Sequence, residues 1–295
     1  MKIVNPSVKL LDTTNSIANI AYAARVCYAT QDKEHRLTDL EFINNVLIPR
    51  KHIYMLRHGT FYLKVYESKA DERIGKLWQN SFCTDRWLEE DGTMNIVANG
   101  QCIYEAGLWN EIFTEEWKEK YLEGGLPLTT IKERANERFS FEVVTQISTS
   151  RELNRVSPNN ISEQSTRYVE VGTICKPHLL YLDKEEISDE DLIEMRDDHN
   201  IGIILYNYLL NTKSAFDSYN KLKEYGLPQQ DARGVLPLDT MTRCVYTYSV
   251  KEWKQILNLR YFEKTGKAHP NAKIIATMIY NELCQLGYKD YLDAE

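Results

Sequence analysis

Residues 139–168 read FSFEVVTQISTSRELNRVSPNNISEQSTRY, and this stretch carries the strongest structural signal in the chain. Alternate positions share one face of an extended strand, and here they are Phe139, Phe141, Val143, Thr145 and Ile147. The alternation predicts a strand over 139–147. Pro158 and Asn159-Asn160 then force a loop. A polar loop directly after a strand is a common position for a ligand site in folds built on a sheet.

The loop that follows the strand is rich in cations. Residues 150–168 contain Arg151, Arg155 and Arg167 against two Glu, together with several hydroxyl and amide side chains. Guanidinium groups bind phosphate and carboxylate bidentately, and neighbouring hydroxyls complete such a cradle. A solvated loop held by salt bridges would contain the same residues. Without further context, this second interpretation is favoured.

The flanking sequence predicts a mixed α/β (α+β) domain with a central sheet covered by helices. Helical spacing of apolar residues begins after Asn15 and recurs over 38–48, 201–222, 250–263 and 271–286. A second strand is predicted over 60–66. Residues 67–138 are interpreted as an insertion within one domain spanning 1–295, because they lack an apolar run for a core of their own. They contain a strand candidate over 94–105 and a polar helix near 109–122.

Composition limits the classes of function. The chain has 295 residues, of which 43% are hydrophobic and 27% charged, and a net charge of −7. An acidic protein is poorly suited to binding a nucleic-acid polymer, since that affinity depends on clustered cations. No apolar run approaches the roughly 18 residues of a membrane span. The six cysteines are scattered, without a CxxC pair or a visible zinc site, which is typical of reduced thiols in a cytoplasmic protein.

Three smaller groups of residues are further candidates for a site. Asp231–Pro237 forms a polar-to-apolar turn in which Arg233 is either an anion anchor or a solvated helix end. Lys251, Gln255 and Arg260 fall on one predicted helix. His52 and His58 flank Tyr54 just before a predicted strand, where a histidine is more often packed or on the surface than catalytic. The sequence contains no G-x-S-x-G, P-loop, GxGxxG or HExxH motif, and no metal site is predicted.

Read in order, five segments resemble the flavin-dependent thymidylate synthase family across nearly the whole chain. They are the AARVCY of 23–28, the HIYMLRHGTF of 52–61, the SRELNRVS of 150–157 running on to STRY at 165–168, the ARGVLP of 232–237, and the SVKEW of 249–253 with LNLR at 257–260. Five ordered matches at matching spacing are hard to obtain by chance.

The resemblance implies reductive methylation of dUMP to dTMP. A bound FAD would carry the hydride, with NADPH and methylenetetrahydrofolate as co-substrates and no enzyme nucleophile. By position, the residues implied to bind dUMP are Glu152, Arg155, Glu163, Ser165, Arg167, Arg233 and Arg260. Among them Arg155 and Arg260 are the implied catalytic residues, with Arg260 at the pyrimidine, where a guanidinium stabilises developing negative charge. Members of the family are homotetramers with active sites shared between subunits.

The departures from the family pattern gather on the implied flavin side. The residues that would contact the cofactor are His52, Arg57, Val156, Ser157, Ser249, Lys251 and Gln255. Val156 and Ser157 replace the His and Arg of the family signature, and Arg57 replaces a Glu. Ser249, Lys251 and Gln255 also replace the residues expected on the closing helix. The residues implied to bind the nucleotide mostly match the family pattern.

Three hypotheses follow from this pattern. The first is an active synthase with a divergent flavin pocket, cytoplasmic in a bacterium or in the host of a phage. The second is a family member that binds dUMP or a related pyrimidine nucleotide but performs other chemistry, such as another C5 modification. The third is a nucleotide-binding protein without enzymatic activity. The first ranks ahead because the nucleotide side is intact.

Overall fold

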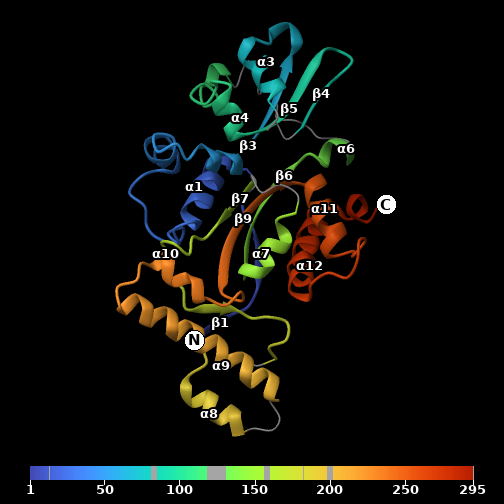
Figure 1. The fold of residues 1–295 in the computed structure, drawn as a ribbon. Helices are drawn as coiled ribbons and strands as arrows, with labels where there is room; N and C mark the ends of the chain where they lie inside the picture. Colours follow the sequence, from blue (N-terminus) through green and yellow to red (C-terminus); the bar gives the residue numbers. More distant parts are fainter. Residues whose placement is uncertain are drawn as a thin grey trace.

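Strand β6 (Arg138–Gln146) forms the centre of the fold, as its alternating sequence predicts (Figure 1). It pairs antiparallel along its full length with β9 (Met241–Ser249). Strands β2 (Ser7–Leu10) and β7 (Ile161–Glu163) complete a four-stranded sheet in the order β2-β6-β9-β7. The structure, a computed structural model, describes residues 1–12, 14–80, 85–117, 131–155, 160–181, 183–197 and 202–294.

Helices cover both faces of this sheet (Figure 1). On one face α7 (Ile147–Leu153), α11 (Val250–Arg260) and α12 (Pro270–Gln285) enclose a core around Trp253. The Trp253 ring lies edge-on to three aromatic rings of β6 and β9, which are Phe141, Tyr246 and Tyr248. Val245 lies between the two tyrosines in sequence and points to the opposite face, where it packs under α1 (Ser16–Val26). The predicted mixed α/β fold is confirmed.

A second, three-stranded sheet in the order β3-β5-β4 stands beyond α1. Its strands are β3 (Thr60–Tyr66), predicted from sequence, β5 (Thr93–Asn99) and β4 (Asp85–Leu88). The strand candidate over 94–105 is correct only to Asn99. There the Asn99 side chain accepts a hydrogen bond from the Cys102 amide and starts helix α4 (Gly100–Glu105). Of the helix expected over 109–122, residues 109–114 form turns and bends, residues 115–117 are helical, and 118–122 lie outside the described residues.

The segment 67–138 contributes more buried apolar surface than its sequence indicates. Ile74, Leu77, Ile96, Cys102 and Ile103 are fully buried in a core that they share with α1 and with β3. These apolar positions are spread over several short elements instead of forming one run, and the core to which they belong is shared with the rest of the chain. Its description as an insertion within one domain stays a prediction.

Shorter elements connect these layers. Before the second sheet come α2 (Asp39–Phe42), a π-helical turn (Ile43–Leu47) and the 3-10 helix η2 (Ile53–His58). Within or after it come η3 (Glu67–Lys69), α3 (Glu72–Gln79) and α6 (Ile131–Arg134). Together, α2 and the π-helical turn confirm the helix predicted over 38–48.

The long helix α9 (Ile203–Glu224) lies at the opposite end of the molecule from the second sheet (Figure 1). It packs with α8 (Asp189–Asp197) and with a parallel pair of short strands, β1 (Lys2–Val4) and β8 (Thr173–Cys175). After α9 the chain continues through α10 (Gln229–Ala232) and η5 (Arg233–Val235), and it closes with α13 (Lys289–Asp293). The predicted helices over 201–222, 250–263 and 271–286 are confirmed. Among the described residues, no helix is both long and apolar enough to span a membrane.

Candidate functional site

Two adjoining cavities open beside β7. The first has a volume of about 490 Å³ and lies between α1, η2 and the residues that follow β7. The second, of about 530 Å³, lies between the start of α7, residues 163–166 and the α10–η5 turn. Glu163 and Ser165 line both. We call the first the tyrosine cavity, after Tyr28, Tyr54 and Tyr168, and the second the arginine cavity, after Arg151 and Arg233.

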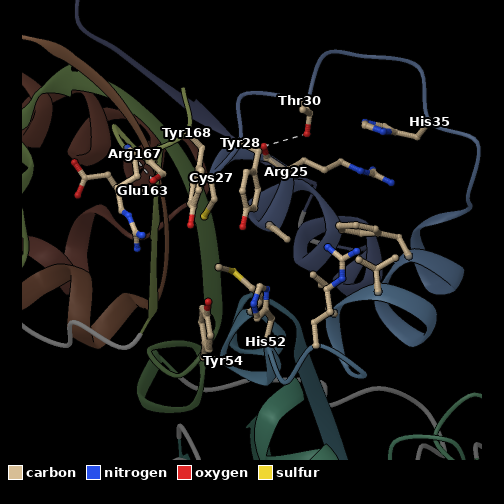
Figure 2. A pocket seen from close by; sticks show the side chains of 17 residues that line it. Arg25, Cys27, Tyr28, Thr30, His35, His52, Tyr54, Glu163, Arg167 and Tyr168 are labelled. Atoms are coloured by element: carbon tan, nitrogen blue, oxygen red, sulfur yellow. Dashed lines mark hydrogen bonds between the residues drawn. The ribbon is translucent and has the colours of Figure 1, made fainter. Parts of the chain in front are cut away.

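The tyrosine cavity has aromatic walls (Figure 2). Tyr28, at the end of α1, and Tyr168 lie together with ring centroids 5.6 Å apart. Tyr54 comes from η2 and lies 5.8 Å from the ring of His52. The three tyrosines are 47–59% exposed. They give the cavity flat surfaces against which a planar group can pack.

Polar groups stand at both ends of the tyrosine cavity. Arg25 donates to Asp39 at 2.7 Å, so its charge is already paired, whereas His35 and Arg50 line the same end and are exposed. At the other end, Arg167 donates to Gln230 Oε1 at 3.1 Å and lies over the Tyr168 ring. Burial raises the pKa of the Cys27 thiol and of the Tyr54 phenol, so both groups are protonated at neutral pH.

The arginine cavity collects groups that bind oxyanions. Arg233 follows the short helix α10, and its Nη1 donates to Thr166 Oγ1 at 3.0 Å. Its Nε donates to the Gln230 carbonyl, also at 3.0 Å, which fixes the direction of the guanidinium. Arg151 on α7 and the Ser165 hydroxyl line the same space. Two guanidinium groups and two hydroxyls around one open volume form an arrangement suited to a phosphate.

Glu163 stands at the junction of the two cavities. Its Oε1 accepts hydrogen bonds from Ser150 Oγ at 3.1 Å and Thr242 Oγ1 at 2.9 Å. Two residues further on, the Ser165 amide donates to the Cys27 carbonyl at 2.9 Å. These bonds hold the residues after β7 against α1 and hold the carboxylate in one direction.

The predicted nucleotide residues divide into two groups. Glu163, Ser165, Arg167 and Arg233 line the cavities. Glu152, Arg155 and Arg260 form a separate cluster outside both linings. In this cluster, Arg260 Nη2 lies 2.7 Å from Glu152 Oε2 and its Nε donates to the Glu152 carbonyl, while Arg155 pairs with Glu152 more loosely, at 3.4 Å.

The predicted cofactor residues are more dispersed. His52 lines the tyrosine cavity. Arg57 is 9% exposed and donates to Gln101 Oε1. Ser249 is the N-cap of α11 in a reciprocal capping box with Glu252. Lys251 and Gln255 are exposed one turn apart on α11. Val156 and Ser157 lie outside the described residues.

Sequence reasoning missed several lining residues. Tyr28 and Cys27 end the AARVCY motif, and Tyr54 lies between the two histidines of the second motif. All three belong to motifs that the sequence analysis quoted, but it assigned no role to them. Arg151 and Thr166 belong to the cation-rich loop, and their place in the arginine cavity was not predicted. Spacing along one chain does not show which polar side chains turn toward a shared cavity. In the described part of the chain, no three His, Cys, Asp or Glu side chains group as metal ligands.

Comparisons with known proteins place this geometry in a family. A model of the family described as thymidylate synthase complementing protein matches residues 129–286, which is more than half of the chain. A flavin-dependent thymidylate synthase of Kosmotoga olearia is 24% identical over 157 residues, covering 52% of this chain and 67% of the relative. The span 129–286 that the family model matches contains β6, the α10–η5 turn and α11.

Two further similarities extend over more of the chain. Altered inheritance of mitochondria protein 9 of Candida dubliniensis is 24% identical over 250 residues, and this chain spans only 39% of that protein's length. The crystal structure of a UMP/dUMP methylase, PolB, from Streptomyces cacaoi bound with 5-Br dUMP aligns over 97% of this chain and 93% of that chain. It does so at 17% identity with a TM-score of 0.42.

The family model covers the strand that centres the sheet and the segments that line the arginine cavity. By that match, the chain belongs to the thymidylate synthase complementing protein family.

Proposed function

We propose that this chain binds dUMP and methylates it to dTMP, with methylenetetrahydrofolate as the carbon donor, NADPH as the reductant and FAD as the bound cofactor. One observation carries the proposal. Arg151, Ser165, Thr166 and Arg233 surround one cavity in a member of this family, and Glu163 stands at its inner end. The Kosmotoga olearia relative is a flavin-dependent thymidylate synthase, which supports the same activity.

In this proposal the arginine cavity holds the nucleotide phosphate. Arg233 and Arg151 supply positive charge, and the Ser165 and Thr166 hydroxyls supply further hydrogen bonds. Glu163 is an acceptor held by Ser150 and Thr242, and it would receive a donor from the nucleoside part of dUMP. The nucleotide would then lie with its phosphate away from the tyrosine cavity and its base toward it.

The tyrosine cavity is the proposed place for the planar reactant beside the base. Its aromatic walls and its volume of about 490 Å³ suit part of a flavin, so the residues present fit that group. Tyr28, Tyr54, Tyr168 and His52 would hold it. A bound flavin supplies hydride transfer to the pyrimidine. The protein residues align the two ligands and exclude water, and the protonated Tyr54 phenol is available as a hydrogen-bond donor.

The cluster of Glu152, Arg155 and Arg260 supports a shared site in a homotetramer. Arg260 is 16% exposed and carries a cation away from both cavities of its own chain. We propose that it faces the nucleotide of a neighbouring subunit, where the guanidinium stabilises negative charge on the pyrimidine. We also propose a cytoplasmic location, supported by the five described cysteines, which are all free thiols.

The proposal is tested by incubating the purified chain with dUMP, methylenetetrahydrofolate, NADPH and FAD and measuring dTMP by mass spectrometry. We expect dTMP in the complete mixture and none when any one component is omitted. Formation of dTMP without FAD would contradict the cofactor assignment. A complete mixture that yields no dTMP would contradict the activity.

A second candidate is a pyrimidine nucleotide-binding protein with altered or absent flavin chemistry. The observation in its favour is the dispersal of the predicted flavin residues. Arg57 is buried against Gln101, Ser249 is engaged in capping α11, and Lys251 and Gln255 point outward. A visible absorption spectrum separates the two candidates. Bound FAD whose spectrum shifts on adding dUMP supports the synthase, whereas dUMP binding without FAD uptake supports the alternative.

A further inference from the structure

His58 is a buried histidine that the proposed chemistry does not use. It ends η2 and is only 2% exposed. Its Nδ1 lies 2.8 Å from Thr247 Oγ1 on β9, and its Nε2 lies 2.8 Å from Ser162 Oγ on β7. One imidazole therefore links three elements that are distant in sequence.

Both ring nitrogens of this imidazole have a hydroxyl partner. Ser162 Oγ also lies 3.2 Å from Met55 Sδ, and Thr247 Oγ1 also lies 2.7 Å from Ser140 Oγ. A hydroxyl can donate one hydrogen bond and accept another, so both ring nitrogens of a neutral imidazole are satisfied here with the proton on either one.

The charged groups around His58 also favour the neutral form. Arg57 on η2 and Arg138 on β6 face it, whereas β7 and β9 present only hydroxyls, and Cys27 of α1 lies beyond Ser162. Burial, with a smaller contribution from the two guanidinium groups, lowers the pKa of His58 to about 3. The ring therefore keeps one protonation state throughout the physiological range.

Two of the three linked elements, η2 and β7, contribute walls of the candidate site. Tyr54 and Met55 of η2 line the tyrosine cavity, and Glu163 of β7 lines both cavities. Strand β7 has only three residues and pairs with β9 alone, so few ladder hydrogen bonds hold it. Because neighbouring residues of a strand face opposite ways, Ser162 turns to His58 while Glu163 turns to the cavities.

We propose that His58 is a positioning residue, which sets the distance between η2 and β7 and thereby the direction of the Glu163 carboxylate. It acts through Ser162 and touches neither ligand. That the ligand bound near Glu163 is dUMP rests on the function proposed above. The connection of η2, β7 and β9 through His58 does not depend on that function.

Two variants separate this role from a general contribution to stability. Ser162→Ala and Thr247→Val each remove one hydrogen bond of the same ring, and only Ser162→Ala releases β7. The readouts are amide hydrogen exchange at Ser162 and Glu163 positions and the dissociation constant for dUMP. For Ser162→Ala we expect the amide exchange rate and the dissociation constant for dUMP each to rise about tenfold, which corresponds to the loss of one buried hydrogen bond. For Thr247→Val we expect the exchange rate and the dissociation constant to stay within about twofold of the native values.

Equal changes in the two variants, or no change in Ser162→Ala, would overturn the positioning role. Nitrogen-15 NMR of the native imidazole is an independent check. We expect a neutral imidazole that does not titrate from pH 5 to 8, and titration of His58 in that range would overturn the assignment. Absence of dUMP binding by the native chain would refute the proposed function only, because hydrogen exchange and NMR need no ligand.

Discussion

Arg233 is the side chain whose position most directly links the geometry to phosphate binding. Its guanidinium is held by Thr166 and the Gln230 carbonyl and still faces an open cavity. Replacing it with Ala removes a charge-assisted hydrogen bond, worth about 1.5–3 kcal/mol. We expect Arg233→Ala to weaken dUMP binding roughly 10- to 150-fold in calorimetric titrations.

A matched control for this variant is available on the second sheet. Arg86 of β4 is exposed and lies over the Trp78 ring, and β4 belongs to the second sheet, at the opposite end of the molecule from α9 (Figure 1). Arg86→Ala should leave dUMP affinity unchanged. Equal losses in the two Arg variants would indicate a nonspecific electrostatic effect and would contradict the assigned phosphate contact.

His58 predicts a specific dependence of stability on pH. Its pKa is about 3 in the folded protein and 6.5 for an ordinary imidazole, so between these values the unfolded chain binds a proton that the folded chain excludes. The contribution is complete above pH 6.5 and is lost as the pH falls. Between pH 7 and 5.5 the native protein should lose about 1 kcal/mol more unfolding free energy than His58→Gln.

Urea unfolding of both proteins at the two pH values measures this difference. Carboxylates and other histidines contribute to both proteins alike, so the difference isolates His58. Identical pH dependence in native protein and variant would show that the imidazole is not buried and neutral as described.

At the scale of elements, α4 and η2 approach each other closely at Gly100. A Cβ at Gly100 would lie 2.6 Å from the Leu56 carbonyl oxygen and 3.2 Å from the Trp109 ring. Since η2 carries Tyr54 and Met55, pushing it away disturbs the tyrosine cavity. Gly100→Ala should lower the unfolding free energy by about 1–3 kcal/mol, as overpacking usually does.

Gly75 provides the matched control for Gly100. It lies inside α3, and a Cβ there meets nothing within 4 Å. Because Ala favours a helix over Gly, Gly75→Ala should stabilise the protein by up to about 1 kcal/mol. Urea unfolding of the two Ala variants measures both effects, and a neutral Gly100→Ala would contradict the close contact.

The elements also show how far sequence alone reaches. Helices and strands with a clear apolar period, such as β3, β6, α9 and α12, were predicted within a few residues. The end of β5 was missed because a side-chain cap at Asn99, and not a change in hydrophobic pattern, stops the strand. The core that segment 67–138 shares with α1 and β3 is not visible in the sequence, because its apolar residues only meet those elements after the chain has folded.

The candidate site was predicted in part for a related reason. The cation-rich loop offered anion binding only as one of two interpretations, and the resemblance to a family gave Glu163, Ser165, Arg167 and Arg233, which line the cavities, a nucleotide role. The tyrosine cavity brings α1, η2 and the residues after β7 together, and no local pattern gives that proximity. Nor does sequence show that Arg57 turns inward to Gln101 and Ser249 to the start of α11.

At the scale of the whole molecule, the site residues implied by the family lie on separate surfaces. Glu152, Arg155 and Arg260 cluster apart from the cavities, and Lys251 and Gln255 are exposed on α11. Assembly of four chains would bring such surfaces together. Light scattering should therefore give a mass about four times the 34.5 kDa of the chain. A monomer that binds dUMP at full affinity would contradict a shared site.

Calorimetric titration of the native chain with dUMP, and separately with deoxyuridine, tests the central claim most directly. Deoxyuridine lacks only the phosphate that Arg151, Arg233 and the neighbouring hydroxyls are proposed to bind. We predict saturable binding of dUMP and binding of deoxyuridine at least about tenfold weaker, as expected for loss of charge-assisted hydrogen bonds. Absence of dUMP binding, or equal affinity for the two compounds, would contradict the account.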